Sequence, residues 1–138
     1  MEIGFIISMY DEIEPVRENI DFIKGNNCRL IVIQSDPKDQ AKIVSDERVD
    51  HYELLPDLAP SPKAYHDQRA QDIGTSDVPA RALSRNFGHA FTAARGFSAD
   101  WWVSILGDVR ITKLAGIRRE ILKMASEKKS VGITRAVG

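Results

Sequence analysis

The sequence predicts an α/β fold, a Rossmann-like and mostly parallel sheet with helices on both faces. The chain has 138 residues, a length at which one domain with one hydrophobic core is expected. Its short apolar runs are nearly continuous, as in strands buried on both faces of a parallel sheet. These runs alternate with segments of helical periodicity, which implies right-handed crossovers between parallel strands. We therefore expect residues 1–138 to form a single soluble domain.

The first part of the chain contains two strand patterns with a helix pattern between them. Residues 3–7 and 30–33 are apolar runs rich in β-branched side chains. Between them, apolar residues recur at three- and four-residue spacing, as in an amphipathic helix: Ile13, Val16, Ile20 and Ile23. Pro15 suits the first turn of that helix, where a missing N–H costs little, and Gly25 suits its end.

The middle of the chain is less regular. A short helix is expected at 39–44 and a third, more alternating strand at 49–55. From about 56 to 77 the chain is polar, contains several prolines and has no sustained periodicity. A loop of that length inside a compact domain is usually functional, mobile or both.

Order returns in the last part of the chain. A helix is expected at 78–94, closed by Gly96, and a fourth strand at 101–106. An amphipathic helix then spans 114–124, and a fifth strand is expected at 131–136. Trp101 and Trp102 begin the fourth strand at its amino end, so we expect them to pack in the core.

Parallel sheets bind ligands beyond the carboxyl ends of their strands, where the strand order reverses. Three polar segments leave the predicted strands at that edge, at 8–12, 34–36 and 107–108. We therefore expect a ligand cleft near Tyr10 and Asp108.

Charge is distributed unevenly although the net charge is only −1. From Arg110 onward eight basic residues face two acidic ones, so this part is near +6 and the rest near −7. Such a basic end is usually a solvated helix face, and it also suits an anionic substrate, an acidic lipid surface or a partner. The near-neutral total argues against a dedicated nucleic-acid binder.

The single cysteine, Cys28, excludes an internal disulfide and a cysteine-rich zinc site, and we expect it to be a small buried side chain. The chain starts directly in a strand pattern and has no long apolar run, so neither a signal peptide nor a membrane span is predicted. A cytoplasmic location is the expectation.

Several common catalytic motifs are absent from the sequence. It contains no GxGxxG after the first strand and no GxxxxGK[ST], which argues against dinucleotide binding and a P-loop. A GxSxG elbow and an HExxH pair are also absent. The three histidines are far apart, and we expect them to be surface or structural residues, with His89 the one nearest to the cleft.

Short motifs at the strand ends and on one helix occur in a particular order: Tyr10-Asp11-Glu12, Asp36, Ser84-Arg85-Asn86 and Gly107-Asp108. Their order and spacing resemble the nucleotide-binding half of the glycosyltransferases of the A-type fold. The resemblance is to the inverting family typified by cellulose and chitin synthases. It implies a nucleotide-diphospho-sugar transferase (GT-A) fold and transfer of a sugar from a nucleoside-diphosphate-sugar, most often a UDP-sugar, by direct displacement.

The resemblance also implies roles for individual residues. Asp36 would accept from a base N–H, and Ser8 to Tyr10 would line the same pocket. Arg85 would face the diphosphate, since a guanidinium is a rigid fork of donors for phosphate oxygens. Asp108 would hold Mg²⁺ or Mn²⁺ against the two phosphates.

Glu12 and Asn86 complete the expected substrate-binding set. Each role has a structural alternative. Asp36 precedes a proline and suits a turn. Arg85 suits a surface ion pair, worth about 0–1 kcal/mol, and Asn86 a local helix hydrogen bond. Asp108, directly after an apolar strand, is the hardest of these residues to explain by structure alone.

The chain departs from the family pattern in two ways. Leu106 stands where the family has the first aspartate of Asp-x-Asp, so one metal-site carboxylate is missing. No residue is a good candidate for the catalytic base, which in the family lies beyond this point. Either the chain is a piece of a longer enzyme, or it binds a donor without completing transfer.

Two alternatives remain open. One is a non-catalytic α/β module that binds a nucleotide or a partner protein. The other is a sugar-phosphate nucleotidyltransferase, which is disfavoured because residues 8–12 are acidic and lack the glycine-rich, basic loop of those enzymes.

Overall fold

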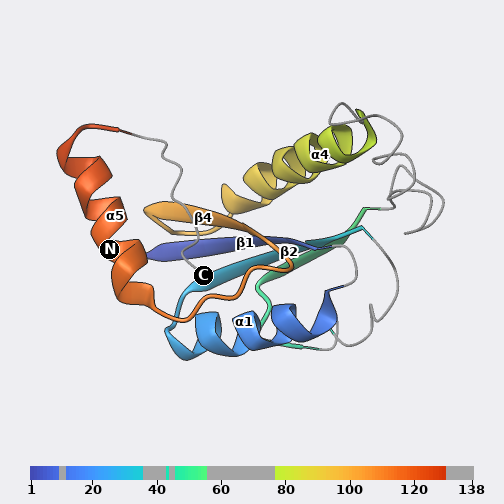
Figure 1. The fold of residues 1–138 in the computed structure, drawn as a ribbon, viewed down its shortest axis with the longest axis horizontal. Helices are drawn as coiled ribbons and strands as arrows, with labels where there is room; N and C mark the ends of the chain where they lie inside the picture. Colours follow the sequence, from blue (N-terminus) through green and yellow to red (C-terminus); the bar gives the residue numbers. More distant parts are fainter. Residues whose placement is uncertain (10–11, 36–42, 44–45, 56–76, 130–138) are drawn as a thin grey trace.

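The computed structural model describes residues 1–9, 12–35, 43, 46–55 and 77–129. Within them lies a four-stranded sheet, parallel at every pairing, with the order β3-β2-β1-β4 (Figure 1). Its strands are β1 (Ile3–Met9), β2 (Arg29–Gln34), β3 (His51–Leu54) and β4 (Trp101–Leu106). The predicted α/β class and parallel sheet are confirmed.

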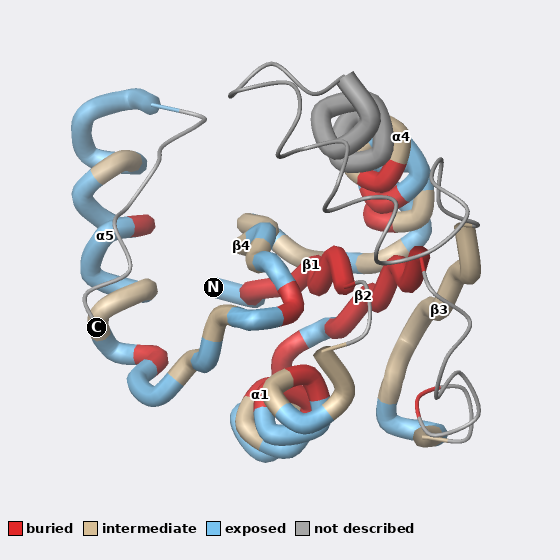
Figure 2. Tube along the Cα trace, turned by 45° about the vertical axis from the view of Figure 1, so that its right-hand side comes forward, coloured by how far each residue is buried: buried red, intermediate tan, exposed pale blue. Residues whose placement is uncertain are grey.

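Helices cover both faces of this sheet, as the sequence predicts. They are α1 (Ile13–Gly25), α4 (Asp77–Ala94) and α5 (Leu114–Ser126). One face packs against α1 and the other against α4, so the sheet lies between two helical layers (Figure 2). The α5 helix stands at one end of the molecule, beyond the amino end of β4, and its apolar side joins the α1 core (Figures 1 and 2).

Strand alternation divides the core into two clusters. In β1, Phe5 and Ile7 face α1, whereas Ile6 faces α4. The apolar stripe of α1 fills the first cluster with side chains of 0% exposure, Val16 and Ile20 among them. Burial of each such side chain stabilises the fold by about 1.5–3 kcal/mol.

The α4 helix approaches the sheet closely because small residues face it. Ala90 and Ala94, four residues apart, are buried against Ile6, Ile31 and Ile33. Asn86 continues the same row one turn earlier and is also buried. This row brings the polar Asn86 to the carboxyl ends of the strands.

The fourth strand differs from the buried strand that its apolar sequence suggests. In the described part of the chain β4 pairs only with β1, so it lies at an edge. Ser104 is exposed, and Leu106 is 49% exposed on the same face. The reason is that α4 packs mainly over β2 and β1, and of β4 only Trp102 packs against the α4 cluster among the described residues.

Some expected elements lie outside the described residues. These are the helix at 39–44 apart from Ile43, the polar loop up to residue 76, and the strand at 131–136. No helix in the described ranges is long and apolar enough to cross a membrane.

Candidate functional site

The strand order places a reversal point between β1 and β4. The chain passes from β1 to β2 and β3 on one side, then crosses to β4 on the other. Ser8 pairs in register with Leu106, so the residues that follow these strands leave the sheet side by side. In open parallel sheets this is where a ligand crevice forms.

Glu12 lies directly against Gly107 at this point. Gly107 N donates to Ser8 O at 2.9 Å, which extends the strand pairing by one residue. A β-carbon on Gly107 would lie 2.6 Å from Glu12 Oε2 and 2.9 Å from the β-carbon of Met9. The carboxylate of Glu12 therefore occupies the space that any side chain at 107 would need.

Asp108 follows Gly107 and is exposed. The loop that carries it is fixed by Asn19, a 1% exposed residue on the apolar face of α1. Asn19 Nδ2 donates to Val109 O at 2.6 Å, and Asn19 Oδ1 accepts from Ile111 N at 2.9 Å. Sequence reasoning missed this residue. The available signal was a polar side chain in the middle of the Val16–Ile20 apolar stripe.

A buried polar cluster lies beside the reversal point, on the α4 face of the sheet. Asn86 Nδ2 is 3.1 Å from Ser8 Oγ and 3.3 Å from Ser35 Oγ. All three side chains are at most 9% exposed. Residues 78 and 51 positions apart in sequence thus meet where β1 and β2 end.

Arg85 extends this cluster toward β3. Its Nη2 donates to Leu55 O at 3.3 Å and to Asn86 Oδ1 at 3.4 Å. The guanidinium therefore lies over the carboxyl ends of the strands, next to Asn86. The structure thus brings Ser8, Arg85 and Asn86 together, and places Glu12 beside the Gly107-Asp108 turn.

Two of the expected substrate-binding residues, Tyr10 and Asp36, lie outside the described residues. They immediately follow Met9 and Ser35, both of which are buried at this edge. The amide and hydroxyl groups of the cluster are suited to hydrogen-bonding a polar ligand.

The expected metal site has few protein ligands. Among the described residues no group of three His, Cys, Asp or Glu side chains could hold a metal ion. The turn at 107 offers the carboxylates of Glu12 and Asp108, while Leu106 supplies no ligand. Mg²⁺ is commonly held by one or two carboxylates together with substrate phosphates, so these residues fit a metal that arrives with a diphosphate.

His89 points to β3, away from the reversal point. Its Nδ1 is 2.8 Å from Glu53 Oε2, and His51 Nε2 is 2.8 Å from Glu53 Oε1. Burial alone would raise the pKa of Glu53, but the hydrogen bonds from the two imidazoles hold it below its ordinary value. This cluster fastens α4 to the sheet and was not anticipated from the sequence.

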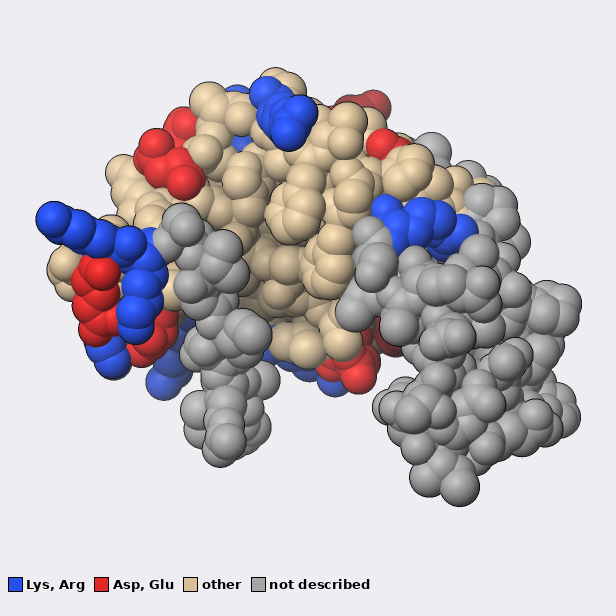
Figure 3. Space-filling model, turned by 90° about the horizontal axis from the view of Figure 1, so that it is seen from above, with Lys and Arg blue, Asp and Glu red and all other residues tan. Residues whose placement is uncertain are grey.

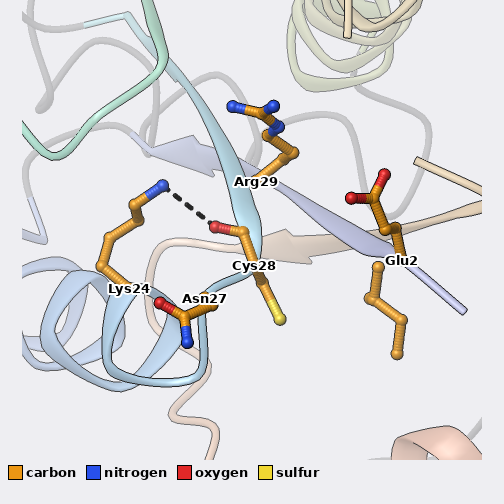
Figure 4. Close-up of a pocket in the computed structure, with 6 residues that line it drawn as sticks. Glu2, Lys24, Asn27, Cys28 and Arg29 are labelled. Carbon is orange, nitrogen blue, oxygen red and sulfur yellow. Dashed lines mark hydrogen bonds between the residues drawn. The ribbon is translucent and has the colours of Figure 1, made fainter. Parts of the chain in front are cut away.

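A pocket of about 210 Å³ opens at the opposite, amino edge of the sheet (Figure 4). It lies between the start of β1, the start of β2 and the end of α1, and Lys24 and Cys28 line it. Cys28 is buried as expected, and burial raises the pKa of its thiol. Trp101 and Trp102 pack against the two core clusters, as the sequence suggests.

Comparisons of this chain with protein-family models, with curated proteins and with solved structures found no match. The chemistry of the carboxyl edge is therefore inferred from the residues described above.

Proposed function

We propose that this chain binds a nucleoside-diphosphate-sugar at the carboxyl edge of β1 and β4, as the donor-binding part of a GT-A glycosyltransferase. The observation that carries the proposal is the meeting of Ser8, Arg85 and Asn86 beside the reversal point. Ser8 belongs to β1, and Arg85 and Asn86 belong to α4, about 80 positions later in the sequence. Their polar side chains meet next to the apolar core of the sheet.

The chemistry of the edge supports a diphosphate ligand. Arg85 offers a planar fork of donors that matches phosphate oxygens. Asp108 is exposed at the end of β4, on the other side of the reversal point. With Glu12 close to the same turn, Mg²⁺ or Mn²⁺ would be held by Asp108 and the two phosphates, and the metal would neutralise charge on the leaving group.

Transfer itself needs a group that takes the proton of the acceptor hydroxyl. Among the described residues Glu12 and Asp108 are the carboxylates nearest this turn, and both are assigned to binding here. The proposal is therefore one of donor binding, with a UDP-sugar as the first ligand to test and an unassigned acceptor.

Isothermal titration calorimetry with UDP and GDP, with and without Mn²⁺, tests the proposal. We expect UDP to bind and Mn²⁺ to tighten binding about tenfold, the effect of a modest metal contact of about 1.4 kcal/mol. Asp108→Asn should abolish the tightening by Mn²⁺. Its matched control is Asp100→Asn, an exposed carboxylate at the amino end of β4 that accepts from Glu2 N at 2.8 Å.

A second pair of variants tests the role of Arg85. Loss of a charge-assisted hydrogen bond costs about 1.5–3 kcal/mol, so Arg85→Ala should weaken UDP binding by about tenfold or more, with or without metal. Arg95→Ala, an exposed arginine just beyond the end of α4, should leave binding unchanged. Absence of UDP and GDP binding under both conditions would remove the glycosyltransferase proposal and favour a protein-binding module.

A further inference from the structure

The segment that includes α5 is the most basic part of the described chain. Residues 113–129 contain six basic and two acidic side chains, a net charge of +4. Since the whole chain carries −1, the remaining residues sum to −5. Figure 3 shows basic side chains gathered at one end of the molecule, with some acidic side chains among them.

The α5 helix has a buried row and an outward face. Leu114 and Ile121 are at most 7% exposed and pack into the α1 core. At about 100° per residue, two adjacent rows of residues four apart lie on the side away from the buried pair. These rows are 115–119–123 and 118–122–126, and all six residues are exposed. Arg118 lies at the edge of this side nearest to Leu114, and its positive charge also acts on the thiol of Cys28.

Three cations surround one large apolar side chain on this outward face. Arg118 shares a row with Leu122, which is 61% exposed, and Arg119 and Lys123 lie in the adjacent row. Within the described residues none of the three cations forms an ion pair. Glu120 lies outside these two rows. Glu127, the residue that follows Lys123 in its row, is paired with Lys129 at 2.8 Å, and the nearby charge of Lys123 also helps to lower the pKa of Glu127.

The position of α5 leaves this face accessible within the described structure. The helix stands at the amino end of the strands and projects beyond β4 (Figures 1 and 2). The candidate donor site lies at the opposite, carboxyl edge. A surface that contacts α5 would therefore leave the reversal point open to ligands.

We propose that the outward face of α5, formed by Arg118, Arg119, Leu122 and Lys123, docks on an anionic lipid surface. Charge complementarity favours an anionic partner, because residues 113–129 carry a net charge of +4 and this face holds three of their cations. The exposed leucine selects lipid over nucleic acid, since an interfacial helix buries apolar side chains at the headgroup boundary while cations contact the headgroups. This inference does not depend on the proposed donor binding.

The strength of such docking is set mainly by the number of cations. Each Lys or Arg next to an anionic leaflet strengthens binding about fivefold. Because the contacts lie at an exposed surface, added salt should weaken them markedly, with a Debye length of about 8 Å at physiological ionic strength. Docking is then weak, reversible and dependent on lipid charge.

Vesicle co-sedimentation of the full chain tests the proposal. Vesicles of phosphatidylcholine with 30% phosphatidylserine should retain the protein at low salt, and vesicles of phosphatidylcholine alone should not. The double variant Arg119→Glu/Lys123→Glu should weaken binding by about 25-fold or more, since it removes two cations and adds repulsion. Leu122→Ser should weaken it by a smaller factor, about threefold to tenfold.

The matched control is Arg17→Glu/Arg95→Glu, which changes the net charge by the same amount at exposed positions on α1 and beyond α4. Retained binding of this control supports docking through α5, and an equal loss in both double variants overturns it. Failure of the unaltered chain to bind the anionic vesicles at low salt also overturns it. Equally tight binding to duplex DNA also overturns the proposal if Leu122→Ser does not change that binding, because the face would then recognise nucleic acid. Far-UV circular dichroism checks that each variant is folded.

Discussion

Position 107 lies between the carboxylate of Glu12 and the β-carbon of Met9, so a side chain there must displace one of them. Gly107→Ala places its β-carbon 2.9 Å from Met9 Cβ, an atom fixed by the strand, and 2.6 Å from Glu12 Oε2. Such overpacking costs about 1–3 kcal/mol. We expect Gly107→Ala to lower the free energy of unfolding by that amount in urea denaturation, and to displace the turn that carries Asp108.

Gly116 is the matched control for this substitution. A β-carbon there meets nothing within 4 Å, and the residue lies inside α5. Gly116→Ala should therefore stabilise the protein by about 0.5–1 kcal/mol through helix propensity. Equal effects at 107 and 116 would show that the close approach of Glu12 does not constrain the turn.

Asn19 is a single residue that joins α1 to the loop after β4. Asn19→Ala leaves Val109 O and Ile111 N without their side-chain partner, at about 1–3 kcal/mol for each group that water does not reach. We expect a loss of about 2–3 kcal/mol in urea unfolding. Asn19→Asp should cost at least as much, because its carboxylate accepts from Ile111 N but places a second acceptor against Val109 O at a buried position.

The exposed Asn26 provides the comparison for Asn19. Its Nδ2 donates to Phe22 O at 2.8 Å on the surface of α1, so water can replace the bond. Asn26→Ala should change stability by no more than about 0.5 kcal/mol. A similarly small effect of Asn19→Ala would mean that the loop holds its position without the bridge.

At the scale of elements, α4 is fastened to β3 by a carboxylate between two imidazoles. The pKa of Glu53 is lowered in the folded protein, so its stabilising effect is present above its ordinary pKa of 4.5 and is lost as pH falls through the folded value. We expect Glu53→Gln to lose about 1–2 kcal/mol at pH 6, with the difference from the unaltered protein shrinking as the pH falls below 4.5.

Urea unfolding at these pH values measures this effect, and the exposed Glu47 supplies the control. Glu47→Gln should have little effect at either end of the range. A difference for Glu53→Gln that stays constant down to pH 3 would contradict the role of the Glu53 carboxylate as an ionised acceptor.

Elements with strong periodicity follow from the sequence almost to the residue. The apolar spacing predicts α1, and the run at 101–106 predicts β4 with the bounds observed. The same run misleads about burial, because periodicity records side-chain type and not which helix covers the strand. Ser104 and Leu106 are exposed because α4 lies over β2 and β1.

Contacts between distant segments are harder to predict than elements. The order of short motifs leads to Ser8, Arg85 and Asn86, but it does not reveal Ser35 as a partner of Asn86. Nor does it reveal Glu53 as the partner of His89, because that pair depends on the register of β3 against β2 and on the rotation of α4. Both contacts depend on the tertiary structure, and no short sequence motif predicts them.

At the scale of the whole molecule, the sheet separates two regions of different charge and chemistry. The reversal point of β1 and β4 lies at the carboxyl edge, and the basic face of α5 lies at the amino end (Figure 1). Because the residues described at these two ends share no hydrogen-bond or ion-pair partner, we expect the effects of substitutions at the two sites to add.

This separation predicts that donor binding and lipid docking respond to different variants. A ligand at about 100 times its Kd should raise the free energy of unfolding by about 2.7 kcal/mol. We expect UDP with Mn²⁺ to stabilise the Arg119→Glu/Lys123→Glu variant as much as the unaltered chain, measured by urea unfolding. Conversely, Asp108→Asn should lose the metal-dependent part of that stabilisation yet sediment normally with anionic vesicles. Loss of both properties in either variant would mean that the two ends of the sheet are coupled, and that the carboxyl edge and α5 act as one site.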